Sequence, residues 1–186
     1  MADGPTTTAY SGTARAFHWL TAIAVLIMFV TGTLMTWRGE AGVWDATTNA
    51  LYSGHKLLGF LLIWVIGLRV AYRMYNGTPA HPPTMNPLLA RVAEATHAVI
   101  YVLLVQVALL GWLGISLFPA LNIFGLFDLP AIAAPDQAQA KVVFGFHEVL
   151  GIALFALISV HIAGALAHAI VFKDGVFQRM LPPRQK

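Results

Sequence analysis

Residues 142–172 read VVFGFHEVLGIALFALISVHIAGALAHAIVF, and Glu148 is the only Asp, Glu, Lys or Arg residue in this stretch. An α-helix needs about 20 mainly apolar residues to cross the hydrocarbon core of a bilayer. Three other stretches meet this criterion, at about residues 16–37, 52–72 and 88–117. The sequence therefore predicts an all-α protein that forms a transmembrane four-helix bundle.

The composition of the 186-residue chain agrees with a membrane protein. Hydrophobic residues make up 58% and charged residues 10% of the chain, whereas a soluble domain carries about 25% charged residues. A soluble enzyme does not fit this balance, and a disordered chain would be poor in aliphatic and aromatic residues. The absence of cysteine excludes disulfides, zinc ribbons, thiolate-bound iron–sulfur clusters and C-x-x-C-H haem attachment.

The basic residues are scattered between the apolar stretches and give a net charge of +3. Such residues are typical of membrane flanks, so we expect contact with membrane lipid and none with nucleic acid. Eight of them fall on one predicted side: Arg15, Arg69, Arg73, Arg91, Lys173, Arg179, Arg184 and Lys186. Three fall on the other: Arg38, Lys56 and Lys141. The positive-inside rule then predicts that both termini are cytoplasmic.

The connections between the four stretches contain neither an internal repeat nor a low-complexity segment. Residues 73–87 are rich in proline and are not expected to be helical throughout. Residues 118–140 contain three prolines and apolar patches, and we expect them to lie across the outer membrane surface as short broken segments. We therefore predict one membrane domain over residues 1–186.

Histidines recur at two depths of the predicted bundle. Ionisable side chains inside membrane spans are costly and usually functional. His161 follows His147 by 14 residues, which is about 21 Å along a helix and within about 40° of the same face. The fourth helix therefore carries one histidine at an outer level and one at an inner level. His55, near the outer start of the second helix, matches the outer level.

At the inner level, either His18 on the first helix or His97 on the third can lie opposite His161, and depth alone does not separate them. His168 lies two helical turns beyond His161, at the cytoplasmic rim. There it is either a polar anchor or a proton-handling group for a small redox partner. His81 falls in the proline-rich loop, where it needs no special role.

Two histidines per level on separate helices suit a planar macrocycle whose iron takes two axial imidazoles. A bare zinc or non-haem iron site would need three or four protein ligands at one point. Histidines that only hydrogen-bond across helices are the remaining alternative. Because two axial imidazoles leave no open coordination position, the spacing predicts two haems between the helices that pass electrons across the membrane.

Four histidine motifs and the C-terminal segment resemble those of the bacterial cytochrome b561 family. The motifs are Phe17-His18-Trp19-Leu20, Gly54-His55-Lys56, Phe146-His147-Glu148 and the stretch from His161 to His168, followed by the closing segment 172–180. The resemblance covers nearly the whole chain and implies a protein of the bacterial inner membrane with two b-type haems. By these motifs, His18 and His161 would bind the inner haem, and His55 and His147 the outer haem.

One activity known in this family is oxidation of superoxide on the periplasmic side, with the electrons passed to ubiquinone near the cytoplasmic haem. The resemblance therefore implies an oxidoreductase that links a periplasmic donor, superoxide or a donor protein, to ubiquinone. His168 matches the second histidine of the family's H-x6-H pattern, where it would contact quinone and handle protons. Lys56, Lys141 and Arg38 would attract an anionic donor such as superoxide or pair with haem propionates.

Two other functions remain open. A cytochrome b membrane-anchor subunit would relay electrons for a separate redox partner protein, which the short loops would need for any substrate chemistry. A non-redox transporter is the less favoured alternative, because the sequence has no inverted repeat of the kind that transporters use.

Overall fold

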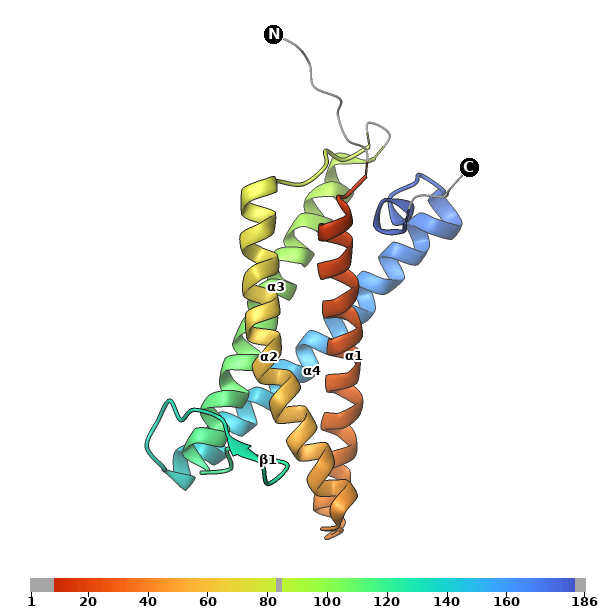
Figure 1. The fold of residues 1–186 in the computed structure, drawn as a ribbon. Helices are drawn as coiled ribbons and strands as arrows, with labels where there is room; N and C mark the ends of the chain where they lie inside the picture. Colours follow the sequence, from red (N-terminus) through yellow and green to blue (C-terminus); the bar gives the residue numbers. More distant parts are fainter. Residues whose placement is uncertain (1–8, 83–84, 183–186) are drawn as a thin grey trace.

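The computed structural model describes residues 9–82 and 85–182, and it is an all-α transmembrane bundle (Figure 1). Its long helices are α1 (Gly12–Glu40), α2 (Ala46–Asn76), α3 (Pro87–Leu117) and α4 (Gln137–Ala167). Each is long and apolar enough to cross a membrane. The predicted fold class is thus confirmed. Arg184 and Lys186, which were predicted to lie on the cytoplasmic side, are outside the described residues. The same holds for both ends of the domain predicted over residues 1–186.

Polar caps extend the helices beyond their apolar stretches. A side-chain oxygen accepts a hydrogen bond from a first-turn backbone N–H at each N-terminus. These caps are Ser11, Asp45, Asn86 and Asp136. Hydropathy detects only the apolar part of a helix, so α1, α2 and α4 begin before the stretches predicted from it.

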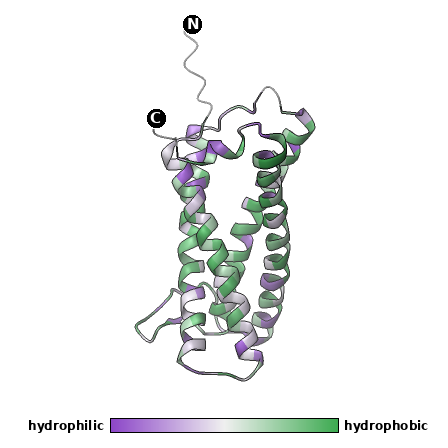
Figure 2. Cartoon of the chain, turned by 90° about the vertical axis from the view of Figure 1, so that its right-hand side faces the viewer, coloured by the Kyte–Doolittle hydropathy of each residue, from purple (hydrophilic) through white to green (hydrophobic). Residues whose placement is uncertain are grey.

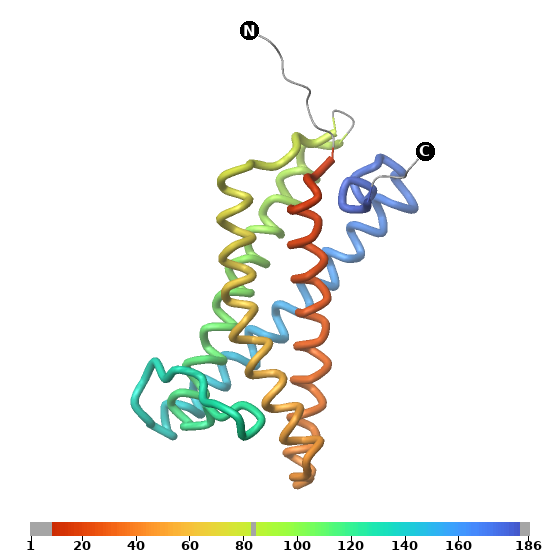
Figure 3. The backbone as a smooth tube through the Cα atoms, in the orientation of Figure 1, coloured from red at the N-terminus to blue at the C-terminus, as the bar shows by residue number. Residues whose placement is uncertain are grey.

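The four helices meet in a small central cluster. Helix α1 packs on α2, and α3 packs on α4. Helix α4 runs obliquely across the bundle, from beside α3 at the hairpin end to the side of α1 at the other end (Figure 3). The buried cluster takes residues from all four helices: Ala24, Val25, Leu62, Ile66, Leu104 and Leu154. It separates the two ends of the bundle.

Large apolar side chains cover most of the outer surface. Figure 2 shows hydrophobic residues along the length of the helices and hydrophilic residues gathered towards the ends. Leu26, Trp64 and Ile152 are each more than half exposed. A surface of this kind is stable against lipid rather than water, in agreement with the composition.

The connection between α3 and α4 forms a short antiparallel hairpin of β1 (Asn122–Ile123) and β2 (Phe127–Asp128). Its turn contains Gly125 in the left-handed region, with φ of +73°. Ile123 and Leu129 are buried against Ile115 of α3. The prediction of segments lying across the membrane surface therefore missed this packing, because an apolar patch can bury itself against protein as well as against lipid.

The C-terminal segment folds back over the end of the bundle opposite the hairpin. Helix α4 continues as a π-helical turn, η1 (His168–Phe172), and a 3₁₀ turn follows, η2 (Phe177–Met180). The indole Nε1 of Trp19 donates to the carbonyl of Met180 at 2.8 Å, and Arg179 donates to the carbonyl of Ala80 at 2.6 Å. The start of α1, the α2–α3 connection and the C-terminal segment thus lie at one end (Figure 1).

Candidate functional site

His55 of α2 and His147 of α4 form a pair near the hairpin end of the bundle. Their ring centroids are 6.2 Å apart and their ring planes are inclined by 80°. Each ring lies against a glycine of a neighbouring helix. A Cβ atom on Gly32 would lie 3.0 Å from Cε1 of His55, and one on Gly111 would lie 3.1 Å from Cε1 of His147. The two glycines therefore make room for the two imidazoles.

Hydrogen bonds fix the proton of each outer histidine on Nδ1. His147 donates from Nδ1 to the carbonyl of Val107 at 2.9 Å. Nδ1 of His55 lies 3.2 Å from Oγ1 of Thr31, whose own hydrogen is donated to the carbonyl of Ile27 at 2.8 Å. The Thr31 oxygen therefore accepts from His55. In both rings Nε2 keeps its lone pair, which is the arrangement of a metal-binding imidazole.

The inner level brings together three histidines from three helices. The ring centroids of His18 and His161 are 6.4 Å apart, and those of His97 and His161 are 5.1 Å apart. Nη2 of Arg69 lies 3.0 Å from Nδ1 of His18. A guanidinium can only donate, so Nδ1 of His18 is the acceptor in this contact. Arg69 also lies over the ring of Tyr101, at 5.2 Å from its centroid.

Two of these pairs match the separation that one haem iron requires. Two imidazoles on opposite sides of one metal ion, with metal–nitrogen bonds of about 2 Å, have ring centroids roughly 6 Å apart. The pair His55 and His147 and the pair His18 and His161 meet this condition, whereas His97 is too close to His161. A His18 ring that holds a metal through Nε2 would carry its proton on Nδ1, and this nitrogen would then no longer accept from Arg69.

The sequence analysis also considered a site for a bare metal ion, such as zinc or non-haem iron, in place of a haem. Within residues 9–82 and 85–182, no three His, Cys, Asp or Glu side chains are arranged to hold such an ion. The described residues offer two imidazoles at the outer level and three at the inner level, where His18 and His161 have the separation given above. A pair of imidazoles suits a macrocycle that brings its own equatorial nitrogens.

The family model for prokaryotic cytochrome b561 matches residues 9–183. The chain belongs to the prokaryotic cytochrome b561 family. The predicted resemblance is thus confirmed. As a cytochrome b561 the protein is a multi-pass protein of the inner membrane that carries b-type haem and transfers electrons across the membrane.

Two curated relatives resemble this cytochrome b561 over nearly its full length. "Cytochrome b561 homolog 2" of Escherichia coli (strain K12) is 33% identical over 174 residues, which cover 92% of this chain and 90% of the relative. "Probable superoxide oxidase CybB" of Yersinia pestis is 24% identical over 186 residues, which cover 95% and 97% of the two chains. Similarity therefore extends across all four helices.

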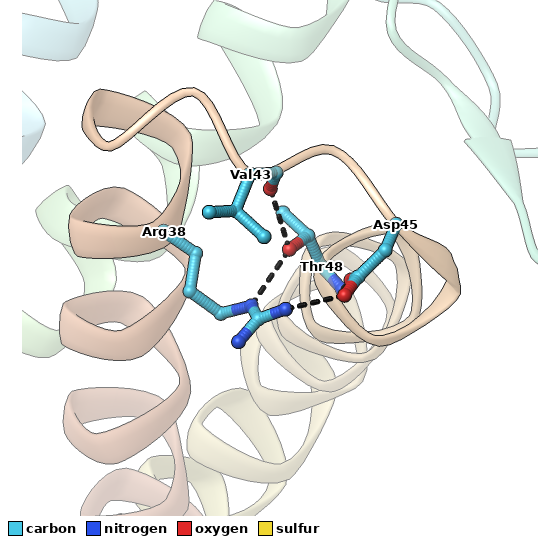
Figure 4. Close-up of polar contacts among 4 residues, drawn as sticks. All are labelled: Arg38, Val43, Asp45 and Thr48. Carbon is cyan, nitrogen blue, oxygen red and sulfur yellow. Dashed lines mark hydrogen bonds and ion pairs between the residues drawn. The ribbon is translucent and has the colours of Figure 1, made fainter.

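Arg38, one of the three cations predicted to face an outer donor or haem propionates, ties α1 to α2 of the cytochrome. Its Nη2 donates to Asp45 at 2.6 Å and its Nε donates to Thr48 Oγ1 at 2.8 Å (Figure 4). Thr48 in turn donates to the carbonyl of Val43. The backbone N–H of Thr48, and then Arg38, lower the pKa of Asp45 below its ordinary value. The ion pair therefore persists at neutral pH and balances the charge of Arg38.

Lys56 and Lys141, the other two predicted outer cations, lie at the hairpin end of the cytochrome. Nζ of Lys56 donates to the carbonyls of Ala120 at 2.9 Å and Asn122 at 2.5 Å. It therefore holds the hairpin connection against α2, one residue after His55. Lys141 lies in the second turn of α4. The roles predicted for these three residues toward a donor or haem propionates stay predictions.

His168 lies on the π-helical turn at the opposite end of the cytochrome, paired with a carboxylate that the sequence analysis did not single out. Its Nδ1 is 2.6 Å from Oδ2 of Asp174. Partial burial acts to raise the pKa of Asp174, but the hydrogen bonds from His168 and from the backbone N–H of Val176 outweigh it and lower the pKa. Asp174 is therefore an ionised partner for His168.

Several site residues were missed by sequence reasoning. Gly32, Gly111 and Thr31 contact the outer histidines, and Arg69 had been counted only as a positive charge. Their depth in the membrane could have indicated them, because small residues and hydroxyl groups are common where membrane helices pack closely. A glycine or threonine at the level of a histidine on another helix is thus a candidate contact. That signal needs the pairing of the helices, which the sequence does not provide.

Proposed function

We propose that the protein transfers electrons from a periplasmic donor to ubiquinone through two b haems, one held by His55 and His147 and the other by His18 and His161. The observation that carries this proposal is the presence of two histidine pairs, with ring centroids 6.2 and 6.4 Å apart, at two levels of one bundle. When bound, each haem would supply one-electron redox chemistry.

The protein side chains orient and insulate these sites. The acceptors Thr31 and Val107 hold the outer imidazoles in the Nδ1–H tautomer and raise their basicity as ligands. The buried aliphatic cluster, which includes Ile66 and Leu154, excludes water between the two levels. Electrons therefore cross a dry region where no side chain of the cluster titrates.

The outer pair belongs on the periplasmic side in this proposal. The end formed by the start of α1, the α2–α3 connection and the C-terminal segment carries most of the basic residues, which the positive-inside rule assigns to the cytoplasm. The hairpin end then faces the periplasm. An open pocket of about 520 Å³ lies there between α2 and the hairpin, with Ser53, Lys56 and Asn122 in its lining. A small donor bound there would lie against Lys56, the residue that follows His55 in the sequence.

Superoxide is the donor that we propose to test first. The printed name of the Yersinia pestis relative refers to superoxide oxidation. We expect a pulse of superoxide to reduce the haems of the purified oxidised protein, and added ubiquinone to reoxidise them, in a stopped-flow visible spectrum. Haems that stay oxidised would exclude superoxide and favour a separate donor protein. Reduced haems that ubiquinone fails to reoxidise would exclude it as the acceptor.

Replacing Thr31 by valine tests the role of its hydrogen bond to His55. The variant leaves Nδ1–H of His55 without this acceptor, which makes the imidazole a weaker electron donor to iron. We expect the reduction potential of one haem to rise while haem content stays the same. Thr33→Val is the matched control, because it makes the same substitution on α1 two residues beyond Thr31. Equal potentials for both variants and the unchanged protein would contradict this role.

A further inference from the structure

The His168–Asp174 pair is built by an unusual backbone path. An α-helix would separate residues six positions apart by about 240° around its axis. Here the π-helical turn over residues 168–172 is followed by Lys173 in the left-handed region, with φ of +51°. This reversal returns Asp174 to His168, and the two side chains are only 14% and 15% exposed. The chain end is therefore shaped around this contact.

The carboxylate of Asp174 is fixed on both of its oxygens. Oδ2 accepts from Nδ1 of His168 at 2.6 Å, and Oδ1 accepts from the backbone N–H of Val176 at 3.1 Å. The segment beyond is anchored by the hydrogen bond from Trp19 to Met180. Because Nδ1 of His168 is committed to Asp174, Nε2 is the nitrogen left to exchange a proton with a further partner.

The surroundings of this pair suit a lipid-soluble quinone. His168 lies seven residues beyond His161, about 10 Å along the helix and within about 20° of the same face. The residues that follow it, Ile170, Val171 and Phe172, are each more than half exposed. The turn that carries His168 therefore exposes apolar side chains where a lipid-soluble ring would approach.

We propose that Asp174 is a positioning residue for ubiquinone reduction: it holds His168 in place and stabilises the imidazolium whose Nε2–H supplies a proton to a quinone oxygen. This inference rests on the proposed function, which supplies the electrons. Reduction of one quinone to quinol consumes two electrons and two protons. One proton leaves Nε2, and the electron pair of the N–H bond stays on the ring. Water at the cytoplasmic surface reprotonates Nε2, and the second proton follows the same route.

The test uses the haem-loaded protein, reduced in the absence of oxygen and then mixed with a short-chain ubiquinone. Stopped-flow absorbance gives the rate of haem reoxidation at saturating quinone. We expect Asp174→Asn to slow this rate about tenfold or more, the effect of losing a charged hydrogen-bond partner, with unchanged haem content and potentials. An asparagine carbonyl can still accept from Nδ1–H, so the geometry is retained while the charge is lost. Asp174→Glu is expected to restore part of the rate.

Glu94→Gln is the matched control, because His81 and Glu94 form a second histidine–carboxylate pair at the same end, 2.9 Å apart and exposed. It is expected to react at the original rate. If Asp174→Asn also reacts at the original rate, or if it slows only together with loss of haem or a shifted potential, the positioning role is wrong and the proposed function stands. If the unaltered protein is not reoxidised by ubiquinone, the proposed function itself fails at its acceptor.

Discussion

Replacing His55 by alanine is expected to halve the haem content of the purified protein, from two haems per chain to one. His55 and His147 form one pair, and His18 and His161 form another on the far side of the buried aliphatic cluster. Loss of one axial imidazole removes one haem without reaching the other site. The measurement is the ratio of haem to protein, together with a redox titration in which one of two components disappears.

Variants of the other three paired histidines show whether the loss of haem follows the pairing. His147→Ala should remove the same redox component as His55→Ala, whereas His18→Ala and His161→Ala should remove the other one. His81→Ala is the control, since His81 lies in an exposed connection and pairs with Glu94. Loss of both haems from every single variant, in protein that remains folded, would show that the two sites are not independent.

Gly111→Val is expected to weaken the retention of the outer haem although it changes no ligand. A Cβ atom at this position would lie 3.1 Å from Cε1 and 3.3 Å from Nδ1 of His147, and valine adds two further methyl groups. The ring must move, and its bond to the carbonyl of Val107 is then lost. Overpacking of this kind costs about 1–3 kcal/mol, which corresponds to roughly tenfold to hundredfold weaker retention of haem.

Gly145→Val provides the matched control for this variant. Gly145 is an exposed residue of α4, two positions before His147 and therefore about 200° around the helix from it, and an added Cβ would meet nothing within 4 Å. It should keep both haems, whereas Gly32→Val, next to His55, should behave like Gly111→Val. Full occupancy of the outer site in both Gly32→Val and Gly111→Val would mean that the two glycines do not determine the position of the imidazoles.

The fold was predictable because its main signal is local. A run of apolar residues long enough to span a bilayer identifies a helix wherever it occurs, so all four helices followed from hydropathy. Their ends did not, because Asp45 and Asp136 stabilise first turns through single hydrogen bonds. The π-helical turn at His168, which precedes the contact with Asp174, has no hydropathy signal either.

The candidate site was predictable as far as counting along a helix allows. Fourteen residues between His147 and His161 fix two levels on one face. Counting does not separate His18 from His97, and the proposal of His18 rests on distances across helices, 6.4 Å against 5.1 Å to His161. The contact between Arg69 and His18 arises from side-chain packing between helices, which no periodic pattern records.

Helix α4 carries one histidine of each pair, whereas α1 and α2 carry one histidine of a single pair. In the proposed function, the separation of the two haems would therefore be set by the number of residues in one continuous helix, and not by how helices slide against one another. Thermal shifts between helices alter each centre's own geometry but leave the spacing along α4 nearly constant. Because electron transfer depends steeply on distance, the proposed arrangement would make the rate of transfer between the two haems insensitive to bilayer thickness and to the packing of the bundle.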